Sequence, residues 1–157
     1  MIGSLNGKLI EKNPTALIIE CSGVGYEVKI SLTTFSAIGS DESIKVFTQF
    51  IVREDAQLLF GFATKEERDI FNHLISVSGI GPKTALTALS GIPVPELKRA
   101  IIDGDLAVLT GVSGIGKKTA ERMIVELREK RNQAVGFKYR IEFSKIGPIT
   151  FITHIDL

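Results

Sequence analysis

Apolar and polar residues alternate through much of the first part of the chain, and a period of two is typical of β-strands. The alternation is clearest over residues 25–30 and 43–52, while 15–21 and 57–62 are mainly apolar and rich in β-branched or aromatic side chains. One helical turn is expected over 33–38. About five or six short strands in so short a segment predict a small closed sheet such as an OB-fold barrel.

A short charged link, Arg53-Glu54-Asp55-Ala56, separates the last two predicted strands. A link of this length between two strands predicts the tip of a β-hairpin. Taken by itself, a charged tip of this kind is an ordinary solvent-exposed turn.

Beyond residue 63 the spacing of apolar residues changes to three and four, which is typical of amphipathic helices. Thr64 and Glu67 have the spacing of a capping box, which marks the start of the first helix. Further helices are expected to begin at Pro82, Pro95, Asp105 and Lys118, the last of them ending near Arg131. The side chains expected to face the core from the last helix are Ala120, Met123, Ile124 and Leu127.

These patterns predict an α+β, multi-domain chain. We expect an OB-fold β-barrel over 1–63, a helical domain over 64–133 and an atypical segment over 134–157. Within that last segment, residues 138–143 and 149–155 are β-prone, and strands are expected there.

The composition argues against several classes of protein. One cysteine, Cys21, excludes a disulfide framework, and one cysteine with two histidines argues against a His/Cys metal site. No apolar run is long enough to span a bilayer, and strand-like alternation begins at Met1, where a signal peptide would begin. We therefore expect no metal, no cofactor and no membrane partner.

The net charge of +1 is small for a protein that binds nucleic acid. Residues 1–63 hold five Lys or Arg and seven Asp or Glu, residues 64–133 hold eleven and nine, and residues 134–157 hold three and two. Any contact with DNA must therefore use a local basic patch rather than the field of the whole chain.

A five-residue sequence occurs twice in the helical part. Val-Ser-Gly-Ile-Gly spans 77–81 and 112–116, an offset of 35 residues, and Lys-Thr-Ala follows at 83–85 and 118–120. Repetition at a fixed offset indicates a repeated structural unit. Two glycines around one isoleucine allow a tight turn with positive φ, from which the isoleucine can point into the core.

Each repeated turn leads directly into a helix, whose first backbone N–H groups lack partners and carry partial positive charge. Lys83, Lys117 and Lys118 lie in these first turns, where the dipole disfavours a cation by a few tenths to about 1 kcal/mol. A bound anion would offset this cost, and phosphate is the natural candidate. A glycine turn can also simply connect two helices, but two copies with matched lysines favour an anion site.

The repeated unit resembles the helix-hairpin-helix motif of DNA-binding proteins, in which hairpin amides bind phosphate without reading bases. The residues expected in the phosphate-binding hairpins are Gly79, Ile80, Gly81, Lys83, Gly114, Ile115, Gly116, Lys117, Lys118 and Arg122. A P-loop is a competing interpretation of 111–118, but Lys118 stands where Mg²⁺ ligation requires Ser or Thr. ATP binding is therefore not expected.

Taken together, the predicted barrel and the repeated helical unit resemble the RuvA family, which binds Holliday junctions within the bacterial branch-migration machinery. The resemblance covers roughly residues 1–131. The residues that carry it are Met1-Ile-Gly3, 23–28, 52–59 with Gly61-Phe62, 79–83 and 114–122.

The resemblance implies a non-enzymatic protein that binds four-way junctions as a homotetramer or an octamer in the bacterial cytoplasm, acting in recombination, repair and the SOS response. It implies that Glu54 and Asp55 form an acidic pin near the crossover, where carboxylates repel phosphates and keep strands apart. The ATPase RuvB is implied as a partner through a third helical domain, and RuvC as a further partner. Residues 134–157 do not match that domain, so we expect junction binding without recruitment of RuvB.

Two other classes of protein stay open at this point. A helix-hairpin-helix DNA glycosylase or lyase would need a base-flipping pocket and a catalytic Asp or Lys within a larger helical body. A single-strand-binding OB protein would need exposed aromatic and basic residues on the barrel. Residues 1–63 are instead net acidic, and their phenylalanines are expected in the core.

Overall fold

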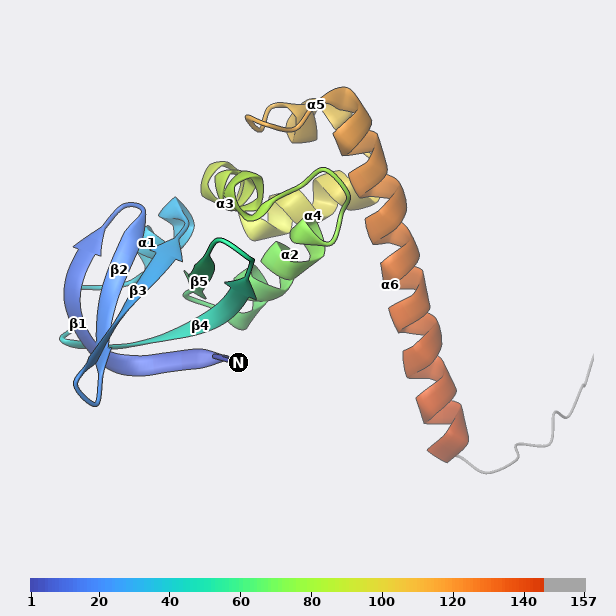
Figure 1. Ribbon diagram of the computed structural model, residues 1–157. Coiled ribbons are helices and arrows are strands. Elements are labelled where there is room, and N and C mark those ends of the chain that lie inside the picture. Colours follow the sequence, from blue (N-terminus) through green and yellow to red (C-terminus); the bar gives the residue numbers. More distant parts are fainter. Residues whose placement is uncertain (146–157) are drawn as a thin grey trace, which may run out of the picture.

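The computed structural model describes the backbone of residues 1–145 and the side chains of residues 1–133 (Figure 1). Strands come first along the chain and helices follow. The strands are β1 (Ser4–Asn13), β2 (Ala16–Cys21), β3 (Val24–Ile30), β4 (Ser43–Val52) and β5 (Gln57–Phe62). The helices are α1 (Leu32–Ala37), which precedes β4, then α2 (Lys65–Ile75), α3 (Pro82–Gly91), α4 (Val94–Asp103), α5 (Leu106–Thr110) and α6 (Lys117–Lys145).

The five strands form a closed barrel in the order β1-β2-β3-β5-β4. The pairing of β3 with β5 is parallel and closes the barrel, while the other four pairings are antiparallel. Alternate apolar side chains fill the interior, among them the fully buried Leu17, Ile19, Val28 and Val46. The predicted small closed barrel is confirmed, and the expected helical turn is α1.

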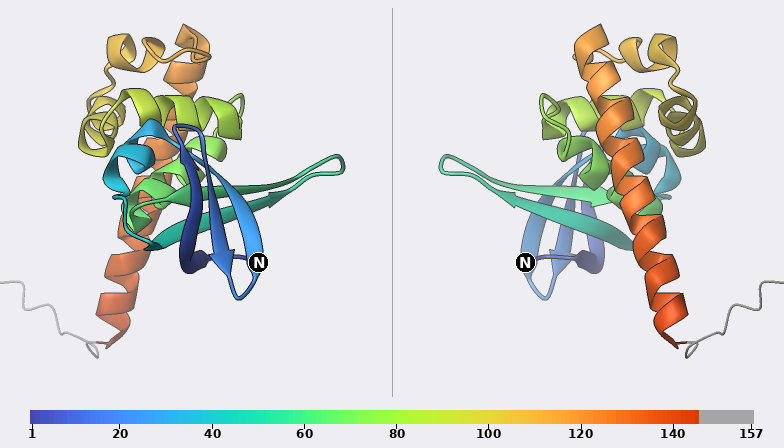
Figure 2. Two further views of the ribbon diagram at one scale, coloured as in Figure 1. Left: turned by 90° about the vertical axis from the view of Figure 1, so that its left-hand side faces the viewer. Right: turned by 90° about the vertical axis from the view of Figure 1, so that its right-hand side faces the viewer.

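The β4–β5 hairpin is the part of the barrel that projects furthest from it (Figure 2). Pairing of the two strands continues to Val52 and Gln57, and the Arg53 amide donates to the Ala56 carbonyl at 2.8 Å. Glu54 and Asp55 are exposed at its end. The predicted hairpin tip is thus confirmed, and we call Glu54 and Asp55 the acidic tip.

The barrel and the helices share apolar packing at β5. Phe60 and Phe62 point toward Phe71 of α2, with ring centroids 5.0 and 4.9 Å away. The cluster that includes these rings continues through the helical part of the chain, where its fully buried members include Leu74, Leu89, Leu97, Leu109 and Met123. A continuous core therefore connects the barrel wall to α6.

The prediction for residues 138–143 was wrong. These residues continue α6, which runs without interruption from Lys117 to Lys145, whereas the sequence predicted a helix ending near Arg131 and a strand beyond it. A strand needs a partner edge for its backbone groups, and the closed barrel leaves little edge to pair with. A helix satisfies the same groups within its own segment. The second β-prone segment, 149–155, lies outside the described residues.

Only half of the predicted capping box forms. The Thr64 side chain accepts from the Glu67 amide at 3.1 Å, as expected for the start of α2. The Glu67 side chain does not turn back to Thr64. It is buried and accepts hydrogen bonds from Ser31 and Thr34 of the barrel.

Candidate nucleic-acid interface

The two copies of the repeat have the same backbone structure. The Ile80 amide donates to the Val77 carbonyl at 3.1 Å, and the Ile115 amide donates to the Val112 carbonyl at 3.1 Å. Both hairpins are followed by a helix, α3 in the first copy and α6 in the second. We call residues 77–84 and 112–119 the first and second hairpins.

The inner part of each hairpin requires glycine and isoleucine. Gly79 has a φ of 93° and Gly114 a φ of 91°, values that favour glycine because a Cβ would crowd the backbone. Ile80 and Ile115 are 5% and 4% exposed. Each isoleucine therefore anchors its hairpin in the core, as the sequence predicted.

The hairpins pack against each other in a reciprocal manner. A Cβ built on Gly114 would lie 3.2 Å from Thr84 Oγ1, at the start of α3, and one built on Gly79 would lie 3.8 Å from Thr119 Oγ1, at the start of α6. Thr84 and Thr119 are equivalent positions of the repeat. The two hairpins are thus neighbours related by an approximate two-fold symmetry.

We expect Gly114→Ala to lower the free energy of unfolding by about 1–3 kcal/mol, because the new Cβ meets Thr84 and the φ is unfavourable for alanine. Urea denaturation followed by circular dichroism measures the change. Gly116→Ala is the matched control and should stay within about 0.5 kcal/mol of the unsubstituted chain. Equal losses for the two variants would contradict this account of the turn.

The outer glycine of each hairpin has a different role. Gly81 and Gly116 cap α3 and α6, since their carbonyls accept from the Ala85 and Ala120 amides at 3.0 and 2.9 Å. A Cβ on either glycine would meet no atom within 4 Å. The folded chain does not need glycine at these two positions, but the open space lets another molecule approach the first amides of each helix.

Exposed lysines surround these helix starts. Lys83 lies in the first turn of α3, and Lys117 and Lys118 open α6. Neither of the ion pairs found among the described side chains involves them, because those pairs join Arg68 to Asp69 and Lys98 to Glu66. Amides, partial helix charges and ammonium groups therefore present positive potential on one side of the helical part.

Arg122 has a structural contact that the sequence did not indicate. Its Nη1 donates to the Ser78 carbonyl at 3.1 Å, which ties α6 to the first hairpin. Ser78 and Arg122 are 44 residues apart, so only the packing of the two copies reveals the pair. A guanidinium has five N–H donors, and a phosphate contact by Arg122 stays a prediction.

The acidic tip lies apart from the two hairpins within one chain. The β4–β5 hairpin projects beyond the helices on the side of the molecule away from α6, and it carries Glu54 and Asp55 at its end (Figure 2). The family resemblance implied that the tip lies near the crossover of a junction, while the hairpins were expected to bind backbone phosphates. A single chain presents them as two separate features.

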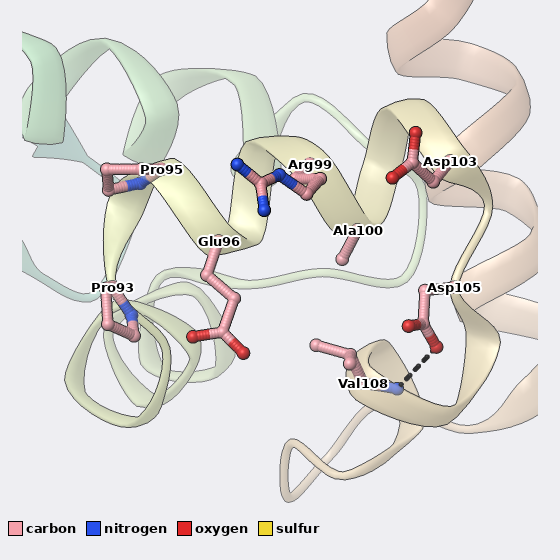
Figure 3. Close-up of a pocket in the computed structure, with 8 residues that line it drawn as sticks. All are labelled: Pro93, Pro95, Glu96, Arg99, Ala100, Asp103, Asp105 and Val108. Atoms are coloured by element: carbon pink, nitrogen blue, oxygen red, sulfur yellow. Dashed lines mark hydrogen bonds between the residues drawn. The ribbon is translucent and has the colours of Figure 1, made fainter.

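The cavity between α4 and α5 has the wrong charge for DNA. It encloses about 440 Å³, and three carboxylates and one guanidinium line it, from Glu96, Asp103, Asp105 and Arg99 (Figure 3). Asp105 also accepts from the Val108 amide at 3.1 Å and so caps α5. Phosphate would be repelled here, so the cavity is not part of the candidate interface.

His73 of α2 adds no positive charge to the interface near neutral pH. Burial lowers the pKa of His73, and nearby Lys130 lowers it further, while Asp69 has the opposite effect. The imidazole lies with Ile70 and Leu127 in a groove between α2, α4 and α6.

Among the residues that the structure describes, no helix has the length and apolar character needed to cross a membrane.

A closed barrel followed by two paired hairpins defines a helix-hairpin-helix DNA-binding protein. A family model described as "RuvA N terminal domain" matches residues 1–61, and one described as "SAM-like Helix-hairpin-helix tandem" matches residues 71–129.

Curated relatives agree with these matches. A protein of Acidovorax sp. (strain JS42) is 51% identical over 141 residues, covering 88% of this chain and 73% of the relative. A protein of Neisseria meningitidis serogroup B (strain ATCC BAA-335 / MC58) is 55% identical over 131 residues, covering 83% of this chain and 68% of the relative. Both are named "Holliday junction branch migration complex subunit RuvA". The chain belongs to the RuvA family, and the resemblance stated from the sequence is confirmed.

Proposed function

We propose that this chain binds four-way junction DNA as the DNA-binding subunit of a branch migration complex in the bacterial cytoplasm. The observation that carries the proposal is the pair of matched hairpins with open, glycine-capped helix starts. Membership in the RuvA family supports it, since the relatives are named for this complex. Binding rather than catalysis is the activity of this chain, ATP hydrolysis in the family belongs to RuvB, and recruitment of RuvB by this chain is still not expected.

Each hairpin binds one stretch of DNA backbone. Phosphate oxygens approach over Gly81 and Gly116 and accept hydrogen bonds from the first amides of α3 and α6. Lys83, Lys117 and Lys118 add Coulomb attraction. Because phosphates are the same in every sequence, these contacts position the DNA without reading its bases, and selectivity must come from the shape of the junction.

Shape selectivity follows from assembly of several chains. One chain carries one acidic tip and one pair of hairpins, so by itself it offers contacts for one arm of a junction. In a homotetramer, four tips meet at the crossover while each pair of hairpins holds an arm. Carboxylates of Glu54 and Asp55 at the centre repel phosphates and keep the strands separated there.

Titration of a labelled four-way junction and a linear duplex of equal length tests the proposed function. We expect the junction to bind at least about tenfold more tightly, because only the junction engages hairpins on several arms at once. Native mass measurement of the free protein should give four, or eight, times the 17.1 kDa chain mass. Equal affinity for both DNAs would contradict the proposal.

Lys117→Ala combined with Lys118→Ala is expected to reduce the slope of log K against log salt concentration by about two, since each phosphate contact releases about 0.9 counterion. Binding at different salt concentrations measures this slope. Lys8→Ala with Lys45→Ala is the matched control, because it removes the same charge from exposed barrel positions. An unchanged slope in the hairpin variant would remove these lysines from the DNA contact.

A further inference from the structure

Glu67 is a buried carboxylate that takes part neither in the proposed phosphate binding nor in the apolar packing of the core. It is 2% exposed in the first turn of α2, and neither ion pair of the described residues gives it a cationic partner. Ser31 Oγ donates to one carboxylate oxygen, and Thr34 Oγ1 donates to the other at 2.6 Å. A buried charge without a cation depends on such hydrogen bonds. We call Ser31, Thr34 and Glu67 the α1 joint.

The hydrogen bonds of the α1 joint require a group that only accepts. Ser31 Oγ accepts from the Thr34 amide at 3.0 Å, and Thr34 Oγ1 accepts from the Ala63 amide at 3.1 Å. Both hydroxyl protons are therefore directed at Glu67. An amide in place of the carboxylate would present N–H donors to one of these hydroxyls and leave its proton without an acceptor.

α1 is also attached to α3. Thr33 Oγ1 donates to the Leu89 carbonyl at 2.6 Å, and the Leu32 amide donates to Ser90 Oγ at 3.0 Å. The first hairpin lies between α2 and α3, so both helices that flank it are hydrogen-bonded to α1. Because α1 lies between barrel strands β3 and β4, these bonds connect the first hairpin to the barrel.

The shared apolar core fixes the orientation of the helices relative to the barrel less strictly than these hydrogen bonds do. Contacts among Phe60, Phe62 and Phe71 are apolar, and the hydrophobic effect is non-directional. Hydrogen bonds depend on distance and angle. The α1 joint is thus a directional part of the connection between the barrel, which carries the acidic tip, and the phosphate-binding hairpins, beside the bonds from α1 to α3 and the bond from Arg68 Nη1 to the Gly3 carbonyl at 3.3 Å.

We propose that Glu67 is a positioning residue for junction selectivity, which holds the first hairpin at a defined position relative to the acidic tip. This inference rests on the proposed function, since a junction must meet the tips and the hairpins at the same time. A linear duplex needs only the hairpins. Loss of the α1 joint should therefore weaken junction binding more than duplex binding.

Glu67→Gln tests the inference with the least change in shape. We expect the junction affinity of this variant to fall about tenfold, which matches the loss of one charge-assisted hydrogen bond. Its duplex affinity should stay within about twofold of that of the unsubstituted chain. Glu66→Gln is the matched control, because it removes the same charge from the exposed neighbour that pairs with Lys98, and it should leave both affinities unchanged. Equal losses on junction and duplex with Glu67→Gln would overturn the positioning role.

A distance measurement without DNA separates this inference from the proposed function. Spin labels at Gln57→Cys, beside the tip, and Ser78→Cys, in the first hairpin, are placed in a Cys21→Ser background. Labelled chains are diluted with unlabelled ones, so that distances within one chain dominate. When Glu67 is present, we expect one narrow distribution of the distance between the two labels. With Glu67→Gln we expect a broader or shifted distribution. An unchanged distribution would overturn the inference even if the junction is preferred.

Thr33→Val removes a different hydrogen bond between α1 and the helices that flank the first hairpin. This variant keeps the inference testable if Glu67→Gln does not fold. Thr33 is exposed, and valine has a similar shape but lacks the hydroxyl that donates to the Leu89 carbonyl. We expect the same direction of change in selectivity and in the distance distribution, with a smaller size. Unchanged selectivity and unchanged distance in this variant would contradict the role of α1.

Discussion

Replacing Gly81 and Gly116 together by alanine is expected to weaken junction binding by about 100-fold, or about 2.7 kcal/mol. A methyl group on either residue would occupy open space over the first amides of α3 or α6. It would hold phosphate away from amides whose hydrogen bonds to a charged group are worth about 1.5–3 kcal/mol each. Fluorescence anisotropy with a labelled four-way junction measures the loss.

Stability should not account for that loss. Neither glycine has a positive φ, and no atom lies within 4 Å of the added Cβ, so urea denaturation should be nearly unchanged. Gly91→Ala is the matched control for DNA binding, because Gly91 ends α3 in equally open space but lies at the helix end opposite the hairpin. If the double variant keeps its junction affinity, phosphate does not bind over these glycines.

Neutralising the acidic tip should have the opposite effect on duplex DNA. Glu54→Gln with Asp55→Asn is expected to raise affinity for a linear duplex by about tenfold, because one charge pair at contact distance is worth about 1 kcal/mol even in water. Binding to the junction should persist, so the ratio of junction to duplex affinity should fall. Parallel titrations of the two DNAs measure this ratio.

The position of the charges, not their number, should matter for this result. Asp41→Asn with Glu42→Gln removes the same charge from exposed residues between α1 and β4 and should leave duplex affinity unchanged. A similar rise in both variants would indicate a general effect of net charge. No rise in the tip variant would show that Glu54 and Asp55 form only a turn.

The local features of the fold could be predicted from the sequence because each depends on neighbouring residues. The repeated Val-Ser-Gly-Ile-Gly predicted two matched turns, and both have the expected positive φ and buried isoleucine. Pro82 and Asp105 predicted the starts of α3 and α5 correctly. The strand pattern predicted a closed barrel, since so short a segment has few other ways to bury alternate residues.

Features that depend on distant residues could not be predicted in this way. Glu67 matched a local capping pattern, but its carboxylate accepts hydrogen bonds from the hydroxyls of Ser31 and Thr34, which lie more than thirty residues earlier in the chain. The contact of Arg122 with Ser78 exists only because the two hairpins pack together. The strand expected over 138–143 failed because β propensity depends on a pairing partner, and these residues continue α6.

Hydrogen–deuterium exchange of the protein with and without a four-way junction tests most directly whether the hairpins hold the DNA. Peptides covering 78–84 and 113–119 should exchange more slowly in the complex, because their amides donate to phosphate. Peptides covering 93–108, around the acidic cavity of α4 and α5 (Figure 3), should be unchanged. Protection at 93–108 with none at the two hairpins would contradict the account.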